Sequence, residues 1–266
     1  MAQRQGSKFS LTPLARDTLL PESARYIGGV LDHGEYLWWT WSGLTDLIKG
    51  GEWSQARRDL MAQLARTANY VKGYDEHFTW AMHGKAANGG AQFLASHLDL
   101  SERKLLLDVG GGPGTYSIAL CQRFPQLQAV VWDVPDALNV SCQVIQQYNL
   151  TDRISLKTGD WDIDEFGTGY DVLLLSNVMH GPGSKAEMKL AKVFRSLESG
   201  GLLIINDFLL NDDKTGPLPA ALFNVMIGAY SNEEIMSIVR KAGFIKITLI
   251  SSDSTVGSGI ITALRP

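Results

Sequence analysis

The stretch LLLDVGGGPGTYSIAL, residues 105–120, decides the fold of this chain. Its first part is a short apolar run of the kind that forms a buried strand, and a helical pattern begins near Thr115. Glycines at positions 110, 112 and 114 allow a tight turn between the two and let a ligand lie against the backbone. The free amides at the start of the helix can meet a carboxylate or a phosphate. The stretch therefore predicts a ligand site at the end of a central strand.

Similar apolar runs recur after this segment, and helical patterns separate most of them. They are QAVVWDV (128–134), RISLKTGD (153–160), YDVLLLSNVM (170–179), GLLIINDFLL (201–210), IKITLIS (245–251) and SGIITALR (258–265). This alternation predicts an α/β fold with a doubly wound, mostly parallel seven-stranded sheet covered by helices on both faces. Only a turn-rich link joins the last two runs, so we expect them to be antiparallel neighbours, with one antiparallel strand at the sheet edge.

The first 100 residues have a different texture, without alternating strands and helices. They are rich in tryptophan, at Trp38, Trp39, Trp41, Trp53 and Trp80. Apolar residues recur at helical spacing in segments such as SQARRDLMAQLARTANYV (54–71), which predicts several helices with an aromatic face. We therefore expect a helical region at residues 1–100 and a ligand-binding domain at residues 101–266.

Composition narrows the class of protein. The 266 residues are 45% hydrophobic and 20% charged, with a formal net charge of -4 and no run of basic residues, which argues against a nucleic-acid partner. No apolar run reaches the roughly 18 residues of a membrane span, and the N-terminus does not resemble a signal peptide. Two isolated cysteines, Cys121 and Cys142, make neither a disulfide framework nor a zinc site. We expect a cytoplasmic protein that acts on a small molecule.

Two further strand ends carry residues that suit an adenosine group. Asp133 ends the second strand, where a carboxylate can accept both hydroxyls of a ribose. Asp160 and Trp161 follow the third strand, where the acid can accept from the adenine amine and the ring can stack on the purine. A dinucleotide fingerprint would place Gly or Ala at position 115, where this chain has Thr115. The three strand ends together predict a cofactor that contains adenosine.

Several blocks of the chain, in this order, resemble the S-adenosylmethionine (SAM)-dependent O-methyltransferases of small hydroxylated natural products, the family of plant caffeate and flavonoid enzymes and many bacterial relatives. The blocks are LTPLAR (11–16), the segment 34–51, DVGGGPG (108–114), VWDVPDAL (131–138), DRISLKTGDW (152–161), LESGGLLIINDFLL (197–210) and AYSNEEI (229–235). The resemblance implies a Rossmann-like class I methyltransferase domain at 101–266. It also implies a helical linker with the remnant of a winged helix at 1–100.

The resemblance also assigns roles to residues. The implied SAM-binding set is Asp108, Gly110, Gly112, Gly114, Asp133, Asp160, Trp161 and Ser176. It makes His180, just after the fourth strand, the general base, with Asp207 on the fifth strand orienting it. The chemistry agrees, because a hydroxyl becomes a good nucleophile once an imidazole takes its proton.

The chain departs from the family pattern in four places. Asp207 stands where the family more often has Glu. The family has His-Asp-Trp where this chain has His180-Gly181-Pro182, and a second acid where this chain has Ala229. The N-terminal helices that interlock two subunits in the family are missing from this sequence. We therefore expect a monomer or a weak homodimer.

The substrate wall is predicted from two apolar segments. The family segment that matches residues 73–84 closes over the methionine end of the cofactor, which makes Phe78 and Met82 candidates. Residues 221–230 add Phe223 and Met226. Apolar walls suit a small aromatic or lipophilic metabolite.

Three other functions compete with the O-methyltransferase hypothesis. A nicotinamide-dependent dehydrogenase shares the sheet type, but Thr115 and the Asp160–Trp161 pair disfavour it. A SAM-binding relative repurposed for non-methylating chemistry, or for a non-catalytic role, stays open because of the altered segment after His180. A catechol methyltransferase would need several oxygen ligands around Mg²⁺, and Asn206–Asp207 alone does not supply them, so we expect no metal.

Overall fold

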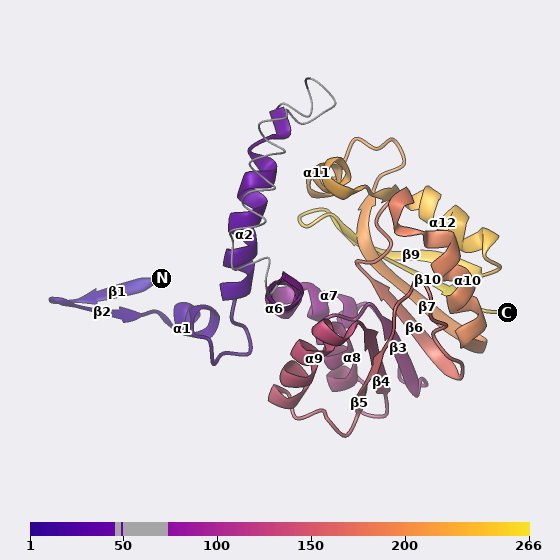
Figure 1. Ribbon diagram of the computed structural model, residues 1–266, viewed down its shortest axis with the longest axis horizontal. Coiled ribbons are helices and arrows are strands. Elements are labelled where there is room, and N and C mark those ends of the chain that lie inside the picture. Colours follow the sequence, from indigo (N-terminus) through magenta and orange to yellow (C-terminus); the bar gives the residue numbers. More distant parts are fainter. Residues whose placement is uncertain (46–48, 50–73) are drawn as a thin grey trace. The chain divides into compact units, whose positions relative to one another are not determined.

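The computed structural model describes residues 1–45, 49 and 74–266, so Trp53 and the predicted helix at 54–71 lie outside the described residues. The chain divides into two compact units, residues 1–90 and residues 91–266 (Figure 1). The division differs from the boundary expected near residue 100. Helix α7 (Ala91–Ser96) packs on α8 (Thr115–Arg123) and thus belongs to the second unit.

The second unit is built on one sheet in the strand order β5-β4-β3-β6-β7-β10-β9. The strands are β3 (Leu105–Val109), β4 (Gln128–Asp133), β5 (Ile154–Thr158), β6 (Tyr170–Ser176), β7 (Leu197–Leu210), β9 (Ile245–Asp253) and β10 (Ser258–Leu264). Strands β3 to β7 are parallel, and the strand order reverses at β3, so the carboxyl ends of β3, β4 and β6 flank a topological switch point. The predicted doubly wound, mostly parallel seven-stranded sheet is confirmed; a two-residue strand, β8 (Tyr230–Ser231), additionally pairs with β7.

One detail of the predicted sheet is wrong. The last two strands are antiparallel neighbours as expected, but the antiparallel strand β10 lies between β7 and β9 and not at the edge. Burial explains this arrangement. The five central residues of β10, from Gly259 to Ala263, are buried, whereas β9 alternates between exposed and half-buried positions. A continuous apolar strand is covered on both faces and takes the interior place, and an alternating strand tolerates the edge.

Helices flank the sheet in two groups (Figure 1). In the first group, α8 packs on α7 and on α9 (Pro135–Gln147); in the second, α10 (Ala186–Ser196) packs on α12 (Asn232–Lys241). A further helix, α11 (Leu218–Ile227), contacts β7. A capping box begins α12, since Ser231 accepts from the Glu234 amide while the Glu234 carboxylate accepts from the Ser231 amide.

The core beneath the carboxyl edge is apolar and fully buried. Leu107 of β3, Leu173 of β6 and Leu203 of β7 are each 0% exposed and belong to one hydrophobic cluster. Close packing of this kind fixes the strand ends relative to one another. The residues that follow β3, β6 and β7 are therefore mounted on a rigid base.

The first unit contains more than the helices expected from the sequence. It begins with an antiparallel hairpin of β1 (Ala2–Gln5) and β2 (Lys8–Leu11), whose four-residue strands are too short to give a recognisable pattern in the sequence. The helices α1 (Pro13–Leu19), α2 (Gly28–Trp41) and α6 (Tyr74–Lys85) follow, and α2 packs on α6. A π-helical turn, η1 (Ala86–Gly90), ends the unit.

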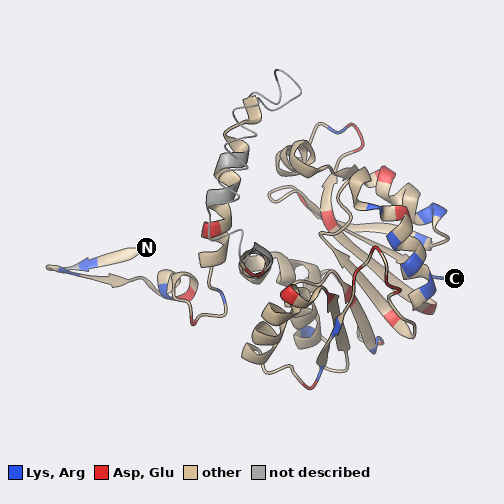
Figure 2. Cartoon of the chain, viewed as in Figure 1, with Lys and Arg blue, Asp and Glu red and all other residues tan. Residues whose placement is uncertain are grey.

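Among the described residues, no helix is long and apolar enough to cross a membrane. Charges of both signs are spread over the second unit. Lys and Arg gather on α10 and α12, and acidic residues mark the loop between β5 and β6 (Figure 2).

Candidate functional site

The turn after β3 has the backbone conformation that the sequence predicts. Gly110, Gly112 and Gly114 have φ angles of 67°, 52° and 73°, in the left-handed region where glycine carries no steric penalty. Helix α8 begins directly afterwards, at Thr115. A Cβ atom placed on Gly112 would meet no atom within 4 Å, so the backbone borders open space at this residue. The turn thus offers bare backbone to a ligand at the amino end of a helix.

Asp133 joins the turn to the end of the neighbouring strand. Its Oδ2 accepts a hydrogen bond of 2.8 Å from the Gly112 amide, and its Oδ1 accepts one of 2.7 Å from the Val134 amide. Val134 itself is 42% exposed. A carboxylate and an exposed apolar side chain therefore stand together beside the glycine turn.

Asp108 lies beneath the same turn and is 1% exposed. Its Oδ2 accepts from the Ser117 hydroxyl at 2.7 Å, while its Oδ1 has no hydrogen-bond partner among the described residues. Burial raises the pKa of this carboxyl to about 7, the Asp133 charge adds to the rise, and the Ser117 hydrogen bond opposes it. A buried acceptor without a partner is costly, so a donor from a ligand above the turn would stabilise it.

Asp160 and Trp161 follow β5, and the structure gives them different surroundings. The Asp160 carboxylate is exposed and accepts from the Asp162 amide at 2.8 Å. The Trp161 ring is half-buried, and its edge lies 2.9 Å from the position of a Cβ on Gly110. Trp161 therefore borders the first glycine of the turn.

Ser176 ends β6 inside a cluster of uncharged polar groups. Its hydroxyl oxygen accepts from Asn206 at 2.9 Å and from Asn177 at 3.2 Å. Burial raises the pKa of Tyr116, while hydrogen bonds with Ser176, Asn177 and Asn206 oppose the rise. Asn177 has a φ of 55°, a left-handed conformation that non-glycine residues seldom adopt and that is frequent at functional sites. The structure places Ser176 in this network, between the start of α8 and the loop after β6.

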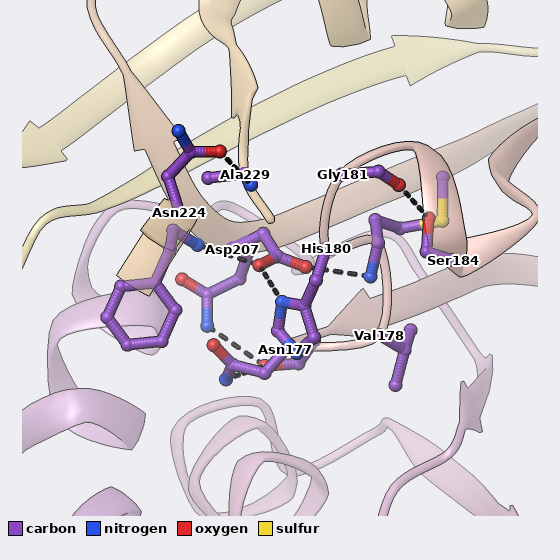
Figure 3. A network of polar contacts seen from close by, with 12 residues as sticks. Asn177, Val178, His180, Gly181, Ser184, Asp207, Asn224 and Ala229 are labelled. Carbon is purple, nitrogen blue, oxygen red and sulfur yellow. Dashed lines mark hydrogen bonds and ion pairs between the residues drawn. The ribbon is translucent and has the colours of Figure 1, made fainter. Parts of the chain in front are cut away.

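His180 and Asp207 meet as the sequence predicts. The His180 Nδ1 and the Asp207 Oδ1 lie 2.8 Å apart, and the other carboxylate oxygen accepts from the Met179 amide at 2.8 Å (Figure 3). Asp207 is 1% exposed, whereas the His180 side chain keeps 22% of its surface. Because Nδ1 is engaged by the carboxylate, Nε2 is the nitrogen left to accept a proton from a substrate.

Aromatic rings border the imidazole. Phe223 of α11 meets the His180 ring edge to face at a centroid distance of 4.9 Å, and Phe208 of β7 stacks on Phe223 at 4.0 Å. Phe223 was predicted from the sequence, and Phe208 was not. Met226 lies on the same helix and is half-buried. The second unit thus places two phenyl rings beside a buried acid–histidine pair.

The predicted wall residues Phe78 and Met82 belong to α6 of the first unit. Within the first unit both are half-buried, and the Phe78 ring meets His33 edge to face at 5.6 Å. Among the described residues, no group of three or more His, Cys, Asp or Glu could hold a metal ion.

Comparison with known proteins shows the family of this chain. A family model described as the O-methyltransferase domain matches residues 63–245. The chain belongs to the O-methyltransferase family. The membership agrees with the predicted fold and confirms the predicted enzyme class, a SAM-dependent O-methyltransferase.

Individual relatives are methyltransferases as well. The enzyme is 28% identical over 274 aligned residues to 3-hydroxy-5-methyl-1-naphthoate 3-O-methyltransferase of Streptomyces sahachiroi. The alignment covers 100% of this chain and 77% of the relative. It is also 36% identical over 163 residues to L-tyrosine C(3)-methyltransferase of Streptomyces lavendulae. This second alignment covers 58% of this chain and 44% of the relative. A crystal structure of human N-acetylserotonin methyltransferase in complex with SAM shares the fold, with a TM-score of 0.79, 21% identity, and coverage of 99% of this chain and 78% of the other.

The structure gives a physical account of where this O-methyltransferase departs from the family pattern. Gly181 has a φ of 48°, and a Cβ on it would lie 3.0 Å from the Gly228 Cα. The Ala229 amide donates to the Asn224 Oδ1 at 2.9 Å (Figure 3). The backbone after His180 therefore packs directly on residues 228–229, where the sequence lacks the second acid. A side chain at Gly181 would collide with that backbone.

Several residues of the O-methyltransferase site were missed by sequence reasoning. They are Tyr116, Asn177, Phe208 and Asn224. Tyr116 lies inside the diagnostic stretch, but a tyrosine at a helix start carries no signal of its own. Asn177 precedes His180 in the loop after β6, whereas Phe208 and Asn224 come near this loop through the pairing of β6 with β7 and the packing of α11 on β7.

Proposed function

We propose that this enzyme transfers the methyl group of SAM to a hydroxyl of a small aromatic or lipophilic metabolite, with His180 as the general base. One observation carries the proposal. The imidazole is tied through Nδ1 to the buried Asp207, on the sheet edge that also carries the glycine turn and Asp133. Base and cofactor residues thus share one edge.

The residues at the turn fit the cofactor. The open backbone at Gly112 accommodates a close ligand, the Asp133 carboxylate suits the ribose hydroxyls, and the unpartnered Asp108 Oδ1 suits an ammonium donor. Trp161 would lie along the adenine, and Asp160, Gly110, Gly114 and Ser176 complete the proposed set. When bound, SAM supplies a methyl carbon that is already electrophilic because it is attached to a sulfonium.

The chain's own residues then need to move one proton and hold the acceptor. His180 Nε2 takes the proton of the substrate hydroxyl, and the Asp207 carboxylate stabilises the imidazolium that forms. Positioning of the acceptor oxygen supplies much of the remaining rate enhancement. The absence of an acid at Ala229 leaves this work to a single carboxylate.

The aromatic substrate class is supported by the two phenyl rings beside the base. Phe223 touches the imidazole and stacks on Phe208, so a flat ring carrying the reactive hydroxyl would have aromatic surface beside the base. The names of the relatives point the same way, to a naphthoate and to tyrosine. Met226, Phe78 and Met82 remain proposed wall residues.

A screen with isotope-labelled methyl donor tests the proposal. Phenols, naphthols and hydroxylated flavonoids are incubated with S-[methyl-¹³C]adenosylmethionine, and the product is read by NMR. The proposal expects an oxygen-bound methyl group in wild type and in the His97→Ala control, an exposed histidine away from the site. His180→Ala should give far less product. Label on ring carbon would favour the chemistry named for the tyrosine relative, and label on neither atom despite cofactor binding would favour a repurposed binder.

The predictions of a monomer or weak homodimer and of a cytoplasmic location remain proposals. Light scattering over a dilution series tests the first, and a tight dimer at low concentration would contradict it. Fractionation of expressing cells tests the second.

A further inference from the structure

Helix α10 carries two buried lysines, which is uncommon because burying an ammonium group is costly. Lys189 is 3% exposed and Lys192 is 6% exposed, and neither takes part in the proposed chemistry. The two are three residues apart, so they lie on one face of the helix. What each one holds shows how they differ.

Both lysines hold backbone carbonyls near the cofactor side, but only one reaches the loop that carries the base. The Lys192 Nζ donates to the carbonyls of Trp161 and Asp164, both at 2.7 Å. The Lys189 Nζ lies 4.0 Å from the centroid of the Trp161 ring and donates to the Val178 carbonyl at 2.7 Å. Lys189 therefore contacts the proposed adenine side and the base loop with a single ammonium group.

Trp161 and Val178 also converge on the glycine turn. The nearest atoms to a Cβ placed on Gly110 are the Val178 Cγ1 at 2.8 Å and the Trp161 Cζ3 at 2.9 Å. The first glycine of the turn, the tryptophan and the base loop thus meet at one point, and Lys189 closes this point from the helix side. Because both side chains pack against Gly110, a displacement of Trp161 would change the packing around Val178.

Three successive residues of the base loop are held from two sides. Lys189 holds the Val178 carbonyl, and Asp207 holds both the Met179 amide and the His180 imidazole, at 2.8 Å each. The orientation of His180 thus depends on the peptide between residues 178 and 179, because that peptide presents its carbonyl to Lys189 and its amide to Asp207.

The charge of Lys189 is balanced by its surroundings. Burial lowers the pKa of Lys189 to about 8, Asp207 and Asp162 act to raise it, and Lys185 acts to lower it. Lys185 in turn forms an exposed ion pair with Asp162 at 2.8 Å. The lysine is therefore mainly protonated at neutral pH. Its ammonium group donates to the Val178 carbonyl, lies over the Trp161 ring and is attracted by the Asp207 carboxylate.

We propose that Lys189 is a positioning residue that couples occupancy of the adenosine side of the site to the placement of His180. A ligand that settles on Trp161 orders the ammonium group, and the ammonium group orders the Val178–Met179 peptide and the imidazole beyond it. This inference rests on the proposed function, because it takes Trp161 as the adenine platform.

Hydrogen exchange tests the coupling without any substrate. Deuterium uptake of a peptide spanning residues 176–185 is measured with and without saturating S-adenosylhomocysteine, in wild type, Lys189→Met and Lys192→Met. Wild type should exchange several-fold more slowly at residues 178–181 when the ligand is bound. Lys189→Met should bind the ligand but lose this slowing. Lys192→Met, which removes another buried lysine from the same helix face, should keep it.

The outcomes separate the two claims. If wild type does not bind S-adenosylhomocysteine, the proposed function fails. If it binds and Lys189→Met keeps the slowing, or if both lysine variants lose it equally, the coupling role of Lys189 is wrong. Should Lys189→Met fail to fold, Lys189→Gln, which keeps a donor but no charge, takes its place in the same comparison.

Turnover gives an independent check once a substrate is known. Lys189→Met should lower kcat more than it raises KM for SAM. In a His180→Ala background the same substitution should cost nothing further, because a residue that acts through His180 has no effect after His180 is removed. Equal losses in both backgrounds would show a merely structural role.

Discussion

The two halves of the sheet's carboxyl edge are built in different ways. In the half formed by β3, β4 and β5, the backbone of the glycine turn forms most of the proposed cofactor site, and Asp133 holds the turn by accepting from the Gly112 amide. In the half formed by β6 and β7, side chains do the work: Asp207 of β7 holds the imidazole and the Met179 amide of the loop after β6. The first half keeps the family pattern, and the second departs from it at Gly181 and Ala229.

The difference teaches which parts of such a site can change. A binding turn made of backbone depends on a few glycines in one contiguous stretch. Few substitutions are tolerated there, because other residues seldom adopt the left-handed conformation. A base held by side chains from separate strands tolerates changes around it as long as the central pair survives. Gly181 is one such change, because its backbone packs on the Gly228 backbone in the loop that carries the base.

Removing the base should have the largest effect. We expect His180→Ala to lower turnover by about 10²–10⁴, because general-base help is worth that much. Initial rates of methyl transfer measure it, with His97→Ala as the control. An unchanged rate would mean that proximity alone carries the reaction and that the β6–β7 half is only a scaffold.

Neutralising the orienting acid should cost less. In Asp207→Asn the side chain keeps one acceptor but presents an N–H to a neighbour that donates, so the imidazole is misoriented and not lost. We expect a fall in turnover of about tenfold or more that stays smaller than that of His180→Ala. Thermal melting by circular dichroism controls for folding, since Asp207 is buried. A loss larger than that of His180→Ala would make Asp207 more than an orienting residue.

On the other half of the edge, Asp133→Ala should weaken the binding of S-adenosylhomocysteine by about 1–3 kcal/mol, the usual loss for a charged hydrogen-bond partner. The variant loses its proposed contact with the ribose and releases the Gly112 amide. Asp136→Ala removes an exposed acid three residues away and should leave affinity unchanged. Calorimetry measures both, and equal effects would reduce the role of Asp133 to net charge.

Gly181→Ala should give the smallest effect, on stability. A Cβ at this residue adds left-handed strain and meets the Gly228 backbone at 3.0 Å, so we expect a loss of about 1–2 kcal/mol in the free energy of unfolding. The matched control is Gly183→Ala, where a Cβ meets no atom within 4 Å. Urea denaturation measures the two. If both variants are equally stable, the backbone contact does not hold the base loop.

The fold of the β3–β5 half could be predicted because its signals are local. The strand, the three glycines and the start of α8 lie within one stretch, and each has a conformational reason that the structure bears out at Gly110, Gly112 and Gly114. The place of β10 could not be predicted in the same way. The apolar run of β10 suits an interior place and the alternating pattern of β9 suits an edge, but the turn between them does not say which of the two pairs with β7.

The base half was only partly readable. His180 and Asp207 could be paired because parallel strands end at one edge, which brings residues after β6 and near the end of β7 together. Phe208, Asn224 and Lys189 could not be found, because they reach the site through tertiary packing. Nothing in their local sequence separates a phenylalanine or lysine that packs in a core from one that borders a base.

The measurement that tests the account most directly is the calorimetric titration of S-adenosylhomocysteine into His180→Ala. If the two halves of the edge do separate work, a variant that no longer turns over should bind this ligand with a Kd within about twofold of wild type, a free-energy difference below about 0.5 kcal/mol. A loss of binding that parallels the loss of turnover would contradict the account, because His180 would then belong to the cofactor site and not to the base.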